Sequence, residues 1–426
     1  MSAPALERSV SGGGRRAGMF SSLRVRNFRL YASGQVVSLL GTWIQRVAQD
    51  WLVLEISGGS ALALGVAVSL QFLPMPLLTL WAGVLADRLD KRHLLISLQY
   101  GTGACALSLG LLELSGFVQL WQVYALCLAL GCCSALEMPV RQSFVMEMVG
   151  REQVGNAVAL NAVIFNSCRT AGPALAGYLI GLFGTGWLFL LNAGSLVAVV
   201  VTLTAMNGSE LVRGDRAPRQ RRQLREGLRY VRGRPDLVLV LALVFVVGTF
   251  GNTFNTTLAV LARNAFRLEA DGFGLLHSML AVGTFTGAVI SAWRTRHRPR
   301  RDPRLLVVSA LAFGLFEMVV ALSPVVVVCG AVLVLVGTAQ MTFTLLANGT
   351  VQLSVDETLR GRVMALYMLL LLGGSPVGSM LSGWLAETVS PRAPLLVGGA
   401  VCVLAAVCGG AVMFVRSRRG SARMSS

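Results

Sequence analysis

The chain contains a single lysine, three histidines and few charged residues of any kind. Asp, Glu, Lys and Arg make up 13% of its 426 residues, against roughly 25% in an ordinary soluble domain. Apolar residues make up 54%, and a soluble fold of that composition would expose large apolar surfaces to water. A soluble enzyme is therefore not expected, and the composition predicts a protein whose surface faces lipid.

The scarcity of lysine and histidine also limits the possible chemistry. Lys91 follows an aspartate and precedes an arginine, whereas the phosphate-binding GxxxxGK[ST] loop needs Gly before its lysine and Ser or Thr after it. The chain therefore has no such loop with which to hydrolyse ATP. His93, His277 and His297 are not paired at catalytic spacing, so a membrane-embedded enzyme is not expected either.

Apolar runs separated by charged or turn residues predict twelve membrane spans, because a bilayer-crossing helix needs about 20 mostly apolar residues. The expected spans are 30–54, 61–86, 93–113, 119–140, 157–182, 186–206, 237–261, 272–293, 305–322, 324–347, 361–386 and 394–415. All eight cysteines fall within these spans, and none lies at metal-ligand spacing from a histidine. We expect them to pack, with no disulfide, metal or cofactor.

The net charge of +17 raises the question of nucleic-acid binding. If the N-terminus is cytoplasmic, 32 of the 37 basic residues fall in alternate, cytoplasmic segments, and the outer loops hold only Arg263, Arg267 and Arg392. Basic loops of this kind orient helices in a membrane and lie against an anionic inner leaflet. We therefore expect a multi-pass protein of a bacterial cytoplasmic membrane with both termini cytoplasmic, and no nucleic-acid partner.

The longest break between spans, 207–236, holds nine arginines and divides the chain into two halves. Its Leu224, Leu228 and Val231 recur at helical spacing, which predicts a short amphipathic helix on the inner membrane surface. Shifting the sequence by 206 residues pairs Gly177 with Gly383, which indicates parallel repeats. The expected units are a tail 1–29, a bundle 30–206, a linker 207–236, a bundle 237–415 and a tail 416–426. The predicted fold is an all-α membrane protein with twelve transmembrane helices in two pseudo-symmetric six-helix bundles.

The turn between the second and third spans has the pattern GxxxDRxxKR, formed by Gly83, Asp87, Arg88, Lys91 and Arg92. An ordinary basic cytoplasmic loop would explain it, but together with twelve spans it resembles the signature loop of the major facilitator superfamily. The family pattern has Gly where this chain has Asp90. Glu137 and Arg141, four residues apart near the cytoplasmic end of the fourth span, are expected to form an inner gate with this loop.

A longer resemblance covers nearly the whole chain. The stretch from Glu137 to Gly177, the opening at 26–35 and the basic segment at 225–235 resemble the subgroup that contains the enterobactin exporter and the macrolide-efflux proteins. Within that stretch, Gly172, Pro173 and Gly177 are similar to the fifth-helix motif associated with antiporters. The resemblance implies efflux driven by the proton gradient and does not identify the cargo.

Glycine and proline mark two expected helices at the same depth. Pro removes a backbone donor and Gly removes side-chain bulk, so these helices could bend or pack closely during alternating access. Both residue types are common in membrane helices, so packing alone is an alternative. The positions are Gly172, Pro173 and Gly177 in the fifth span and Pro376, Gly378 and Gly383 in the eleventh.

Four charged residues fall inside expected spans: Arg46, Asp50, Arg169 and Glu317. A charge at mid-bilayer costs at least about 2.5 to 3.5 kcal/mol, so such groups should face a wet cavity or each other. Arg46 and Asp50 are four apart and share a helix face. Asp50 is our first candidate for proton coupling and Glu317 the second, with Arg46 or Arg169 moving close to a carboxylate as it loses its proton. The alternatives are a permanent structural salt bridge for Asp50 and a packing or interface role for Glu317.

Mild polar groups on the seventh and tenth spans lie beside aromatic residues and suit an amphiphilic molecule. Hydrogen bonds between helices explain them equally well. The candidates are Asn252, Asn255, Thr256, Gln340 and Thr344.

The sequence as a whole predicts a monomeric secondary transporter, not an enzyme, that exchanges protons for an amphiphilic small molecule such as a siderophore, a macrolide or another natural product. The alternatives are a membrane subunit of an ATP-driven system and a non-transporting sensor or scaffold.

Overall fold

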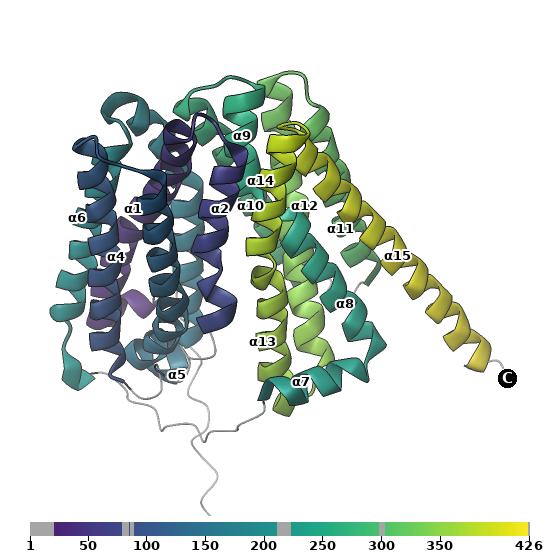
Figure 1. Ribbon diagram of the computed structural model, residues 1–426. Coiled ribbons are helices and arrows are strands. Elements are labelled where there is room, and N and C mark those ends of the chain that lie inside the picture. Colours follow the sequence, from purple (N-terminus) through teal and green to yellow (C-terminus); the bar gives the residue numbers. More distant parts are fainter. Residues whose placement is uncertain (1–20, 79–84, 86–88, 211–222, 298–302, 425–426) are drawn as a thin grey trace, which may run out of the picture.

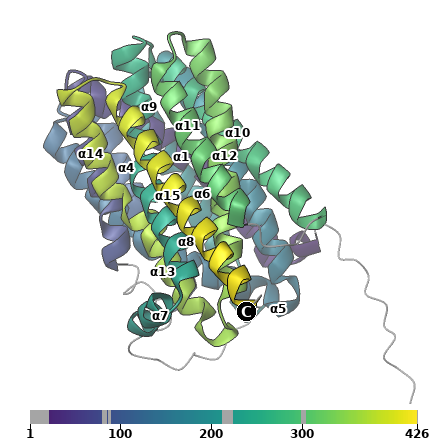
Figure 2. The same cartoon turned by 90° about the vertical axis from the view of Figure 1, so that its right-hand side faces the viewer.

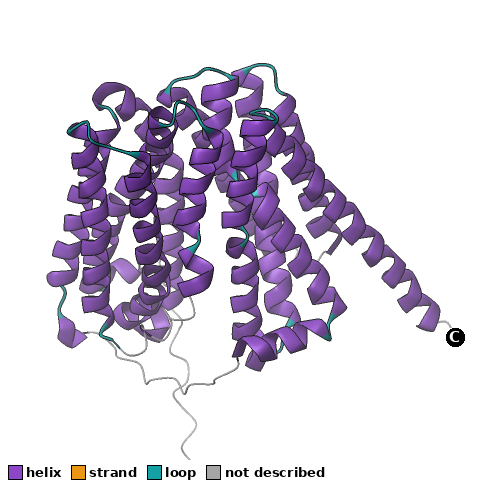
Figure 3. Ribbon diagram, in the orientation of Figure 1, coloured by secondary structure: helices purple, strands orange, loops and turns teal. Residues whose placement is uncertain are grey.

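The computed structural model describes residues 21–78, 85, 89–210, 223–297 and 303–424, and every regular element in these ranges is a helix (Figure 3). The helices are α1 (Arg26–Ile56), α2 (Ala61–Phe72), α4 (Lys91–Leu114), α5 (Leu120–Phe183), α6 (Thr185–Thr204), α7 (Gln223–Arg232), α8 (Pro235–Val246), α9 (Phe254–Val260), α10 (Ala270–His297), α11 (Pro303–Leu322), α12 (Val326–Ser354), α13 (Glu357–Gly373), α14 (Ser375–Thr388) and α15 (Ala393–Met424). The all-α prediction is confirmed.

Ten stretches of the described chain are helices long and apolar enough to cross a membrane. The 31-residue α1 and the part of α5 after Gly150 are also long, but polar side chains such as Gln45 and Gln49 dilute their apolar character. The count of twelve spans stays a prediction. Large apolar side chains are exposed along the outer helices, including Val327 and Trp293, as expected where helices face lipid.

The helices form two groups (Figure 1). In the first, α1 packs against α5 and α6, and α4 packs against α5 and α6. In the second, α11 packs against α12 and α15, and α10 packs against α12. The most extensive contacts between the groups join α5 with α10 and α2 with α14. The short basic helix predicted in the linker is α7, which lies across the same end of the bundle as the C-terminus (Figure 1).

The joining pairs rest on glycine contacts at the end of the bundle opposite α7. A Cβ atom on Gly177 of α5 would lie 2.6 Å from the Ala270 carbonyl oxygen of α10, and one on Gly65 of α2 would lie 2.7 Å from the Ser379 carbonyl oxygen of α14. The Glu387 carboxylate of α14 also accepts a hydrogen bond from the Ala61 N–H at 2.7 Å. The two halves are therefore held in close contact at this end.

The fourth and fifth spans meet within α5. Gly150 alone has non-helical angles there, with φ of 67° and ψ of 175°, a region that favours glycine. The fourth span was expected to end at 140, yet the helix continues to Gly150 through Pro139. Proline is tolerated in membrane helices because neighbouring groups satisfy the carbonyl that it leaves unpaired. Residues near the predicted end of this span therefore lie in mid-helix.

The seventh span is interrupted, which the expected single helix over 237–261 did not anticipate. A π-helical turn, η3 (Val247–Gly251), follows α8, and non-helical Asn252 and Thr253 precede α9 and a second π-helical turn, η4 (Leu261–Ala265). A Cβ on Gly251 would lie 2.3 Å from the Phe313 ring, so the turn packs closely against α11. The interruption turns polar residues of this span toward the space between the halves.

The eleventh span is also divided, since α13 ends at Gly373 and α14 begins at Ser375. Pro376 occupies the first turn of α14, where its missing N–H costs no helical hydrogen bond. Its carbonyl oxygen accepts a hydrogen bond from the Ser69 hydroxyl of α2 at 2.6 Å. Seen from the side, α15 is nearest the viewer and runs beside α8, with which it is in contact (Figure 2).

Candidate substrate cavity

A cavity of about 380 Å³ lies between the two halves. The first half contributes residues of α1, α2, α4, α5 and α6, and the second contributes the interrupted seventh span together with α10, α13 and α14. Helices of both groups thus meet at one space, which a rigid-body movement of either group would reshape.

Two arginines expected from the sequence line this cavity, one from α1 and one from α5. The guanidinium carbon of Arg46 lies 4.8 Å from the centre of the Trp43 ring and 6.0 Å from that of Phe72. Its Nε is buried and has no hydrogen-bond partner among the described residues. Arg169 donates to the Thr284 hydroxyl of α10 at 2.5 Å, so it spans the two halves.

Aromatic rings form one wall of the cavity. The Trp43 and Phe165 rings pack edge to face with their centres 5.8 Å apart. Gly172, one helical turn beyond Arg169, leaves room for the tryptophan, since a Cβ there would lie 2.5 Å from the Trp43 Cβ. Phe165, Arg169 and Gly172 are spaced by four and three residues, so a single face of α5 presents them all. Apolar and cationic surface therefore adjoin in this wall.

The interrupted seventh span faces the opposite side of the cavity. Asn252 accepts a hydrogen bond from Gln340 of α12 at 2.9 Å, and Asn255 lies 3.3 Å from Nε2 of His277 on α10. Asn252, Asn255 and His277 line the cavity, whereas Gln340 does not. Of the expected cargo contacts, only the two asparagines reach it. Thr256 is fully buried, and the Thr344 hydroxyl bonds to the carbonyl one turn earlier in its helix.

Sequence analysis missed His277 as a cavity residue. Its side chain is 9% exposed, and its Nδ1 has no partner among the described residues. A lone histidine in an apolar helix gives no signal of its own, but it lies four residues after Phe273, whose ring it meets edge to face. His277 reaches the cavity because α10 packs against α5.

The two candidate coupling carboxylates are buried outside the cavity lining. Asp50 is 2% exposed, and it forms no ion pair with Arg46 or with any other described residue. A permanent Arg46–Asp50 salt bridge is therefore absent from this conformation. Glu317 of α11 is fully buried, and neither of its oxygens has a hydrogen-bond partner among the described residues. It lies beside Gly398 of α15, close to the π-helical turn η3.

Glu137 and Arg141 lie together at the cavity wall. Their ion pair measures 3.5 Å; Gln99 of α4 donates to Glu137 at 3.0 Å, and Arg141 donates to Gln35 of α1 at 3.1 Å. This network ties α1, α4 and α5 together at one level. The remaining members of the expected gate, Gly83, Asp87 and Arg88, lie outside the described residues.

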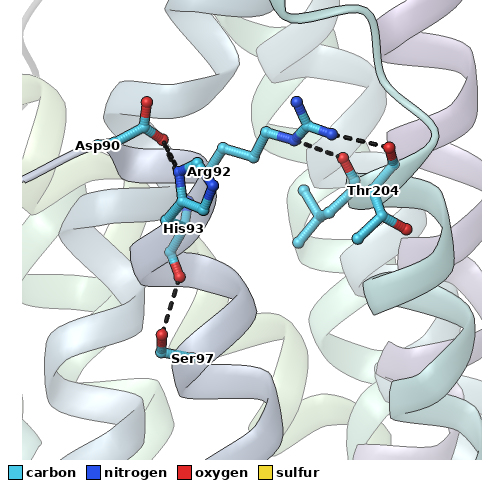
Figure 4. A network of polar contacts seen from close by, with 6 residues as sticks. Asp90, Arg92, His93, Ser97 and Thr204 are labelled. Carbon is cyan, nitrogen blue, oxygen red and sulfur yellow. Dashed lines mark hydrogen bonds and ion pairs between the residues drawn. The ribbon is translucent and has the colours of Figure 1, made fainter.

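Arg92 acts as a helix cap in this structure and does not join that network (Figure 4). Its guanidinium donates to the carbonyl oxygens of Leu203 and Thr204, at 2.7 and 2.8 Å, where α6 ends. Asp90 caps the start of α4 by accepting from the His93 N–H at 3.1 Å. Partial burial alone would raise the pKa of Asp90, but the hydrogen bonds from His93 outweigh it and hold that pKa below its usual value.

Several of the glycines and prolines expected to allow bending lie at close contacts between helices. Pro173 does not interrupt α5, and its carbonyl oxygen would lie 2.4 Å from a Cβ on Gly274 of α10. Gly383 would meet the Ala61 carbonyl at 2.6 Å, and Gly378 would overlap the Thr249 carbonyl of η3. The break in the eleventh span lies at Gly374, two residues before Pro376.

Three named relatives resemble this chain along most of their length. The staphyloferrin A transporter of Staphylococcus aureus is 24% identical over 84% of this chain and 89% of its own. The multidrug efflux pump Tap of Mycolicibacterium fortuitum is 26% identical over 85% and 91%, and the enterobactin exporter EntS of Shigella boydii is 25% identical over 87% and 88%.

The fold has solved counterparts as well. A bacterial homolog of the human lysosomal transporter Spinster, in an inward-facing and unoccupied conformation, superposes with a TM-score of 0.70 at 14% identity, covering 93% of this chain and 97% of that one. Residues 17–425 match the family described as transmembrane secretion effector. The chain, an integral membrane protein and a secondary transporter for small molecules, therefore belongs to the transmembrane secretion effector family of the major facilitator superfamily.

Proposed function

We propose that this protein exports an amphiphilic small molecule, such as a siderophore, a macrolide or another natural product, from a bacterial cell in exchange for protons. The observation that carries the proposal is the cavity between the two halves, lined by arginine, asparagine and aromatic side chains from both. A polar and aromatic space of this kind suits a molecule with both characters. The siderophore and multidrug carriers among the relatives are consistent with such a cargo.

The proposed movement is a rocking of residues 30–206 against 237–415, with the protein acting as a monomer. Hydrogen bonds between the described parts of these two units lie beside the cavity or toward the end of the bundle opposite α7. They join Glu387 to Ala61, Asn264 to Gly59, Ser69 to Pro376 and Arg169 to Thr284. We propose that this end faces outward and is closed, and that the termini and the basic loops face the cytoplasm and its anionic leaflet.

The proposed coupling groups are Asp50 and Glu317, the two carboxylates buried in the first and second halves. A buried carboxylate is stable in the neutral form, and a change of conformation that brings it to water or to an arginine releases its proton. For Asp50 the nearby cation is Arg46, one helical turn away. Glu137 and Arg141 are proposed to close the cytoplasmic side together with Gly83, Asp87, Arg88 and Arg92. The proposed hinges are Gly172, Pro173, Gly177, Pro376, Gly378 and Gly383.

Purified protein in liposomes with an imposed pH gradient and no ATP tests the proposal. Uptake of erythromycin and of a catechol siderophore is compared between the wild type, Asp50→Asn and Glu317→Gln. Glu55→Gln is the matched control, because Glu55 is an exposed carboxylate at the end of the same helix as Asp50. We expect gradient-driven transport in the wild type and the control, and its loss in one or both of the other variants.

Two results would count against this proposal. Unchanged gradient-driven transport in both Asp50→Asn and Glu317→Gln would remove the coupling assignment and leave the export function. Absence of transport of every compound under any gradient, with protein that is folded and correctly inserted, would favour a sensor or a subunit that needs an ATPase.

A further inference from the structure

We infer that the cavity selects an anionic cargo, a molecule that joins a carboxylate, sulfonate or similar negative group to an aromatic or apolar body. This inference rests on the proposed function, since it names the charge class of the exported molecule. Its basis is the convergence of Arg46 and Arg169 on one cavity without a carboxylate partner for either.

The charge balance of the lining comes first. The charged side chains that line the cavity are Arg46, Arg141, Arg169 and one acid, Glu137. Glu137 is engaged by Arg141 at 3.5 Å and by Gln99 at 3.0 Å. Two guanidinium groups therefore remain without an acidic neighbour in the lining. A guanidinium is always charged at physiological pH, so the cavity carries a net positive charge in every protonation state of its histidine.

The arginines and the histidine of the cavity also have hydrogen-bonding groups that the described residues leave unused. A guanidinium has five N–H donors in a planar fork that matches a carboxylate. Arg169 uses a neutral hydroxyl, that of Thr284, and the buried Nε of Arg46 has no partner among the described residues. The Nδ1 of His277, on a side chain that is 9% exposed, is also unpartnered in that part of the chain. His277 lines the same cavity as Arg46 and Arg169.

A third step concerns the body of the cargo. Arg46 lies over the Trp43 and Phe72 rings, and Phe165 packs against Trp43 on the face of α5 that also carries Arg169. An anion bound between the arginines would therefore have its carbon skeleton against these rings. Aromatic faces attract cations. Arg46 already lies over the Trp43 and Phe72 rings, so its charge would repel a cationic cargo from them. The lining also offers such a cargo no unengaged carboxylate.

Asp50 is the buried acid that shares a helix with Arg46, so its charge has to be considered as well. It lies on the same helix as Arg46, one turn away, yet it is outside the cavity lining and is not ion-paired with Arg46. A cargo in the cavity would contact Arg46, which lines it, and would not contact Asp50, which does not. Charge selection should therefore follow the arginines.

The test measures binding of two probes that share a fluorophore and differ in permanent charge. The anionic probe is 5-(dimethylamino)naphthalene-1-sulfonate. The cationic probe is the same 5-(dimethylamino)naphthalene with a trimethylammonium group in place of the sulfonate. Energy transfer to the bound fluorophore from the seven tryptophans, of which Trp43 lines the cavity, gives the signal in detergent-purified full-length protein. We expect the sulfonate to bind at least about tenfold more tightly than the ammonium probe. We expect Arg46→Gln and Arg169→Gln each to weaken sulfonate binding by about tenfold or more, the loss typical of one charge-assisted hydrogen bond.

Arg392→Gln is the matched control, because it removes the same charge from an outer loop where Arg392 lies over the Phe266 ring. Its sulfonate affinity should equal that of the wild type. If the glutamine variants do not fold, competition in the wild type decides, with unlabelled naphthalene-1-sulfonate displacing the probe and the unlabelled ammonium analogue failing to do so. Equal or tighter binding of the ammonium probe, or full sulfonate affinity in both glutamine variants, would overturn the inference.

The same probes separate this inference from the proposed function. Gradient-driven transport of the ammonium probe or of erythromycin, whose tertiary amine is protonated at neutral pH, without transport of the sulfonate, would keep export and refute anion selection. Tight and arginine-dependent sulfonate binding without transport of any compound would keep anion selection and refute export.

Discussion

Substituting Gly177 by alanine should favour the conformation in which the two halves part at the end opposite α7. A Cβ at this position would lie 2.6 Å from the Ala270 carbonyl oxygen, whereas ordinary van der Waals contact begins at 3.4 Å. The facing groups are helix backbone, which cannot rotate away as a side chain can. Helices α5 and α10 must therefore separate by several tenths of an ångström for the alanine to fit.

The cost falls mainly on the closed end. Overpacking by one methyl group typically costs about 1 to 3 kcal/mol, and a coupling of that size shifts a two-state equilibrium about 5- to 150-fold. If the contact opens during transport, the open state escapes this cost. Hydrogen–deuterium exchange measured by mass spectrometry on the start of α10 and the end of α5 should therefore rise in Gly177→Ala.

Gly181→Ala provides the matched control, since it lies one turn further along α5 and its Cβ would meet nothing within 4 Å. Its exchange should match that of the wild type. Equal protection in the two variants would show that this contact does not separate, and the rocking movement between the halves would have to be abandoned. A fall in thermal stability without added exchange would mean that the alanine merely strains a permanent interface.

Three further substitutions test particular contacts. Gly172→Val should displace Trp43, whose Cβ would lie 2.5 Å from the new Cβ, and should lower sulfonate binding and transport by about tenfold, whereas Gly155→Val should not. Arg92→Ala should cost about 1 kcal/mol for each of its two hydrogen bonds to the end of α6, measured as thermal unfolding in detergent, and Arg92→Lys should restore part of this. Lys91→Met should cost about 1 to 3 kcal/mol because it leaves the Glu147 carboxylate without its ion-pair partner. Removing both charges of that pair should cost less than removing the lysine alone, and an equal or larger loss in the double variant would refute the account.

The all-helical membrane fold could be predicted because the length of an apolar run can be read directly from the local sequence. The linker helix also follows, since Leu228 and Val231 recur at helical spacing, and Val231 is buried in the structure. The shift that pairs Gly177 with Gly383 proves informative, because each meets a glycine of the other half, Gly274 and Gly65. A repeat in the sequence thus marks equivalent contacts in space.

The interruptions within helices could not be predicted in the same way. In soluble proteins a proline such as Pro139 often marks a helix end, because it leaves one helical carbonyl without its N–H partner. Membrane helices tolerate proline, because neighbouring groups satisfy that carbonyl. The break at Asn252 and Thr253 depends on how closely η3 packs against α11, α13 and α14, which is a property of tertiary contacts. Neither signal is contained in the local apolar pattern.

The cavity was predictable in its charges and not in its arrangement. Arg46 and Arg169 attract attention because isolated charges in apolar helices are costly. Their convergence depends on α1 packing against α5, and the contribution of His277 depends on α5 packing against α10. The spacing of four residues places Asp50 on the same face of α1 as Arg46. Only Arg46 lines the cavity, whereas Asp50, one turn further along, is buried in the core.

The positive lining of the cavity has an electrical consequence. Bacterial membranes are negative inside, so an anion that leaves moves down the voltage, with a gain of about 2.3 kcal/mol per unit charge at 100 mV. One proton entering for each monoanion leaving would transfer two charges per cycle and draw about 4.6 kcal/mol from the same voltage. Such a carrier would generate current, and a potassium diffusion potential alone, without any difference in pH, would be enough to drive its turnover.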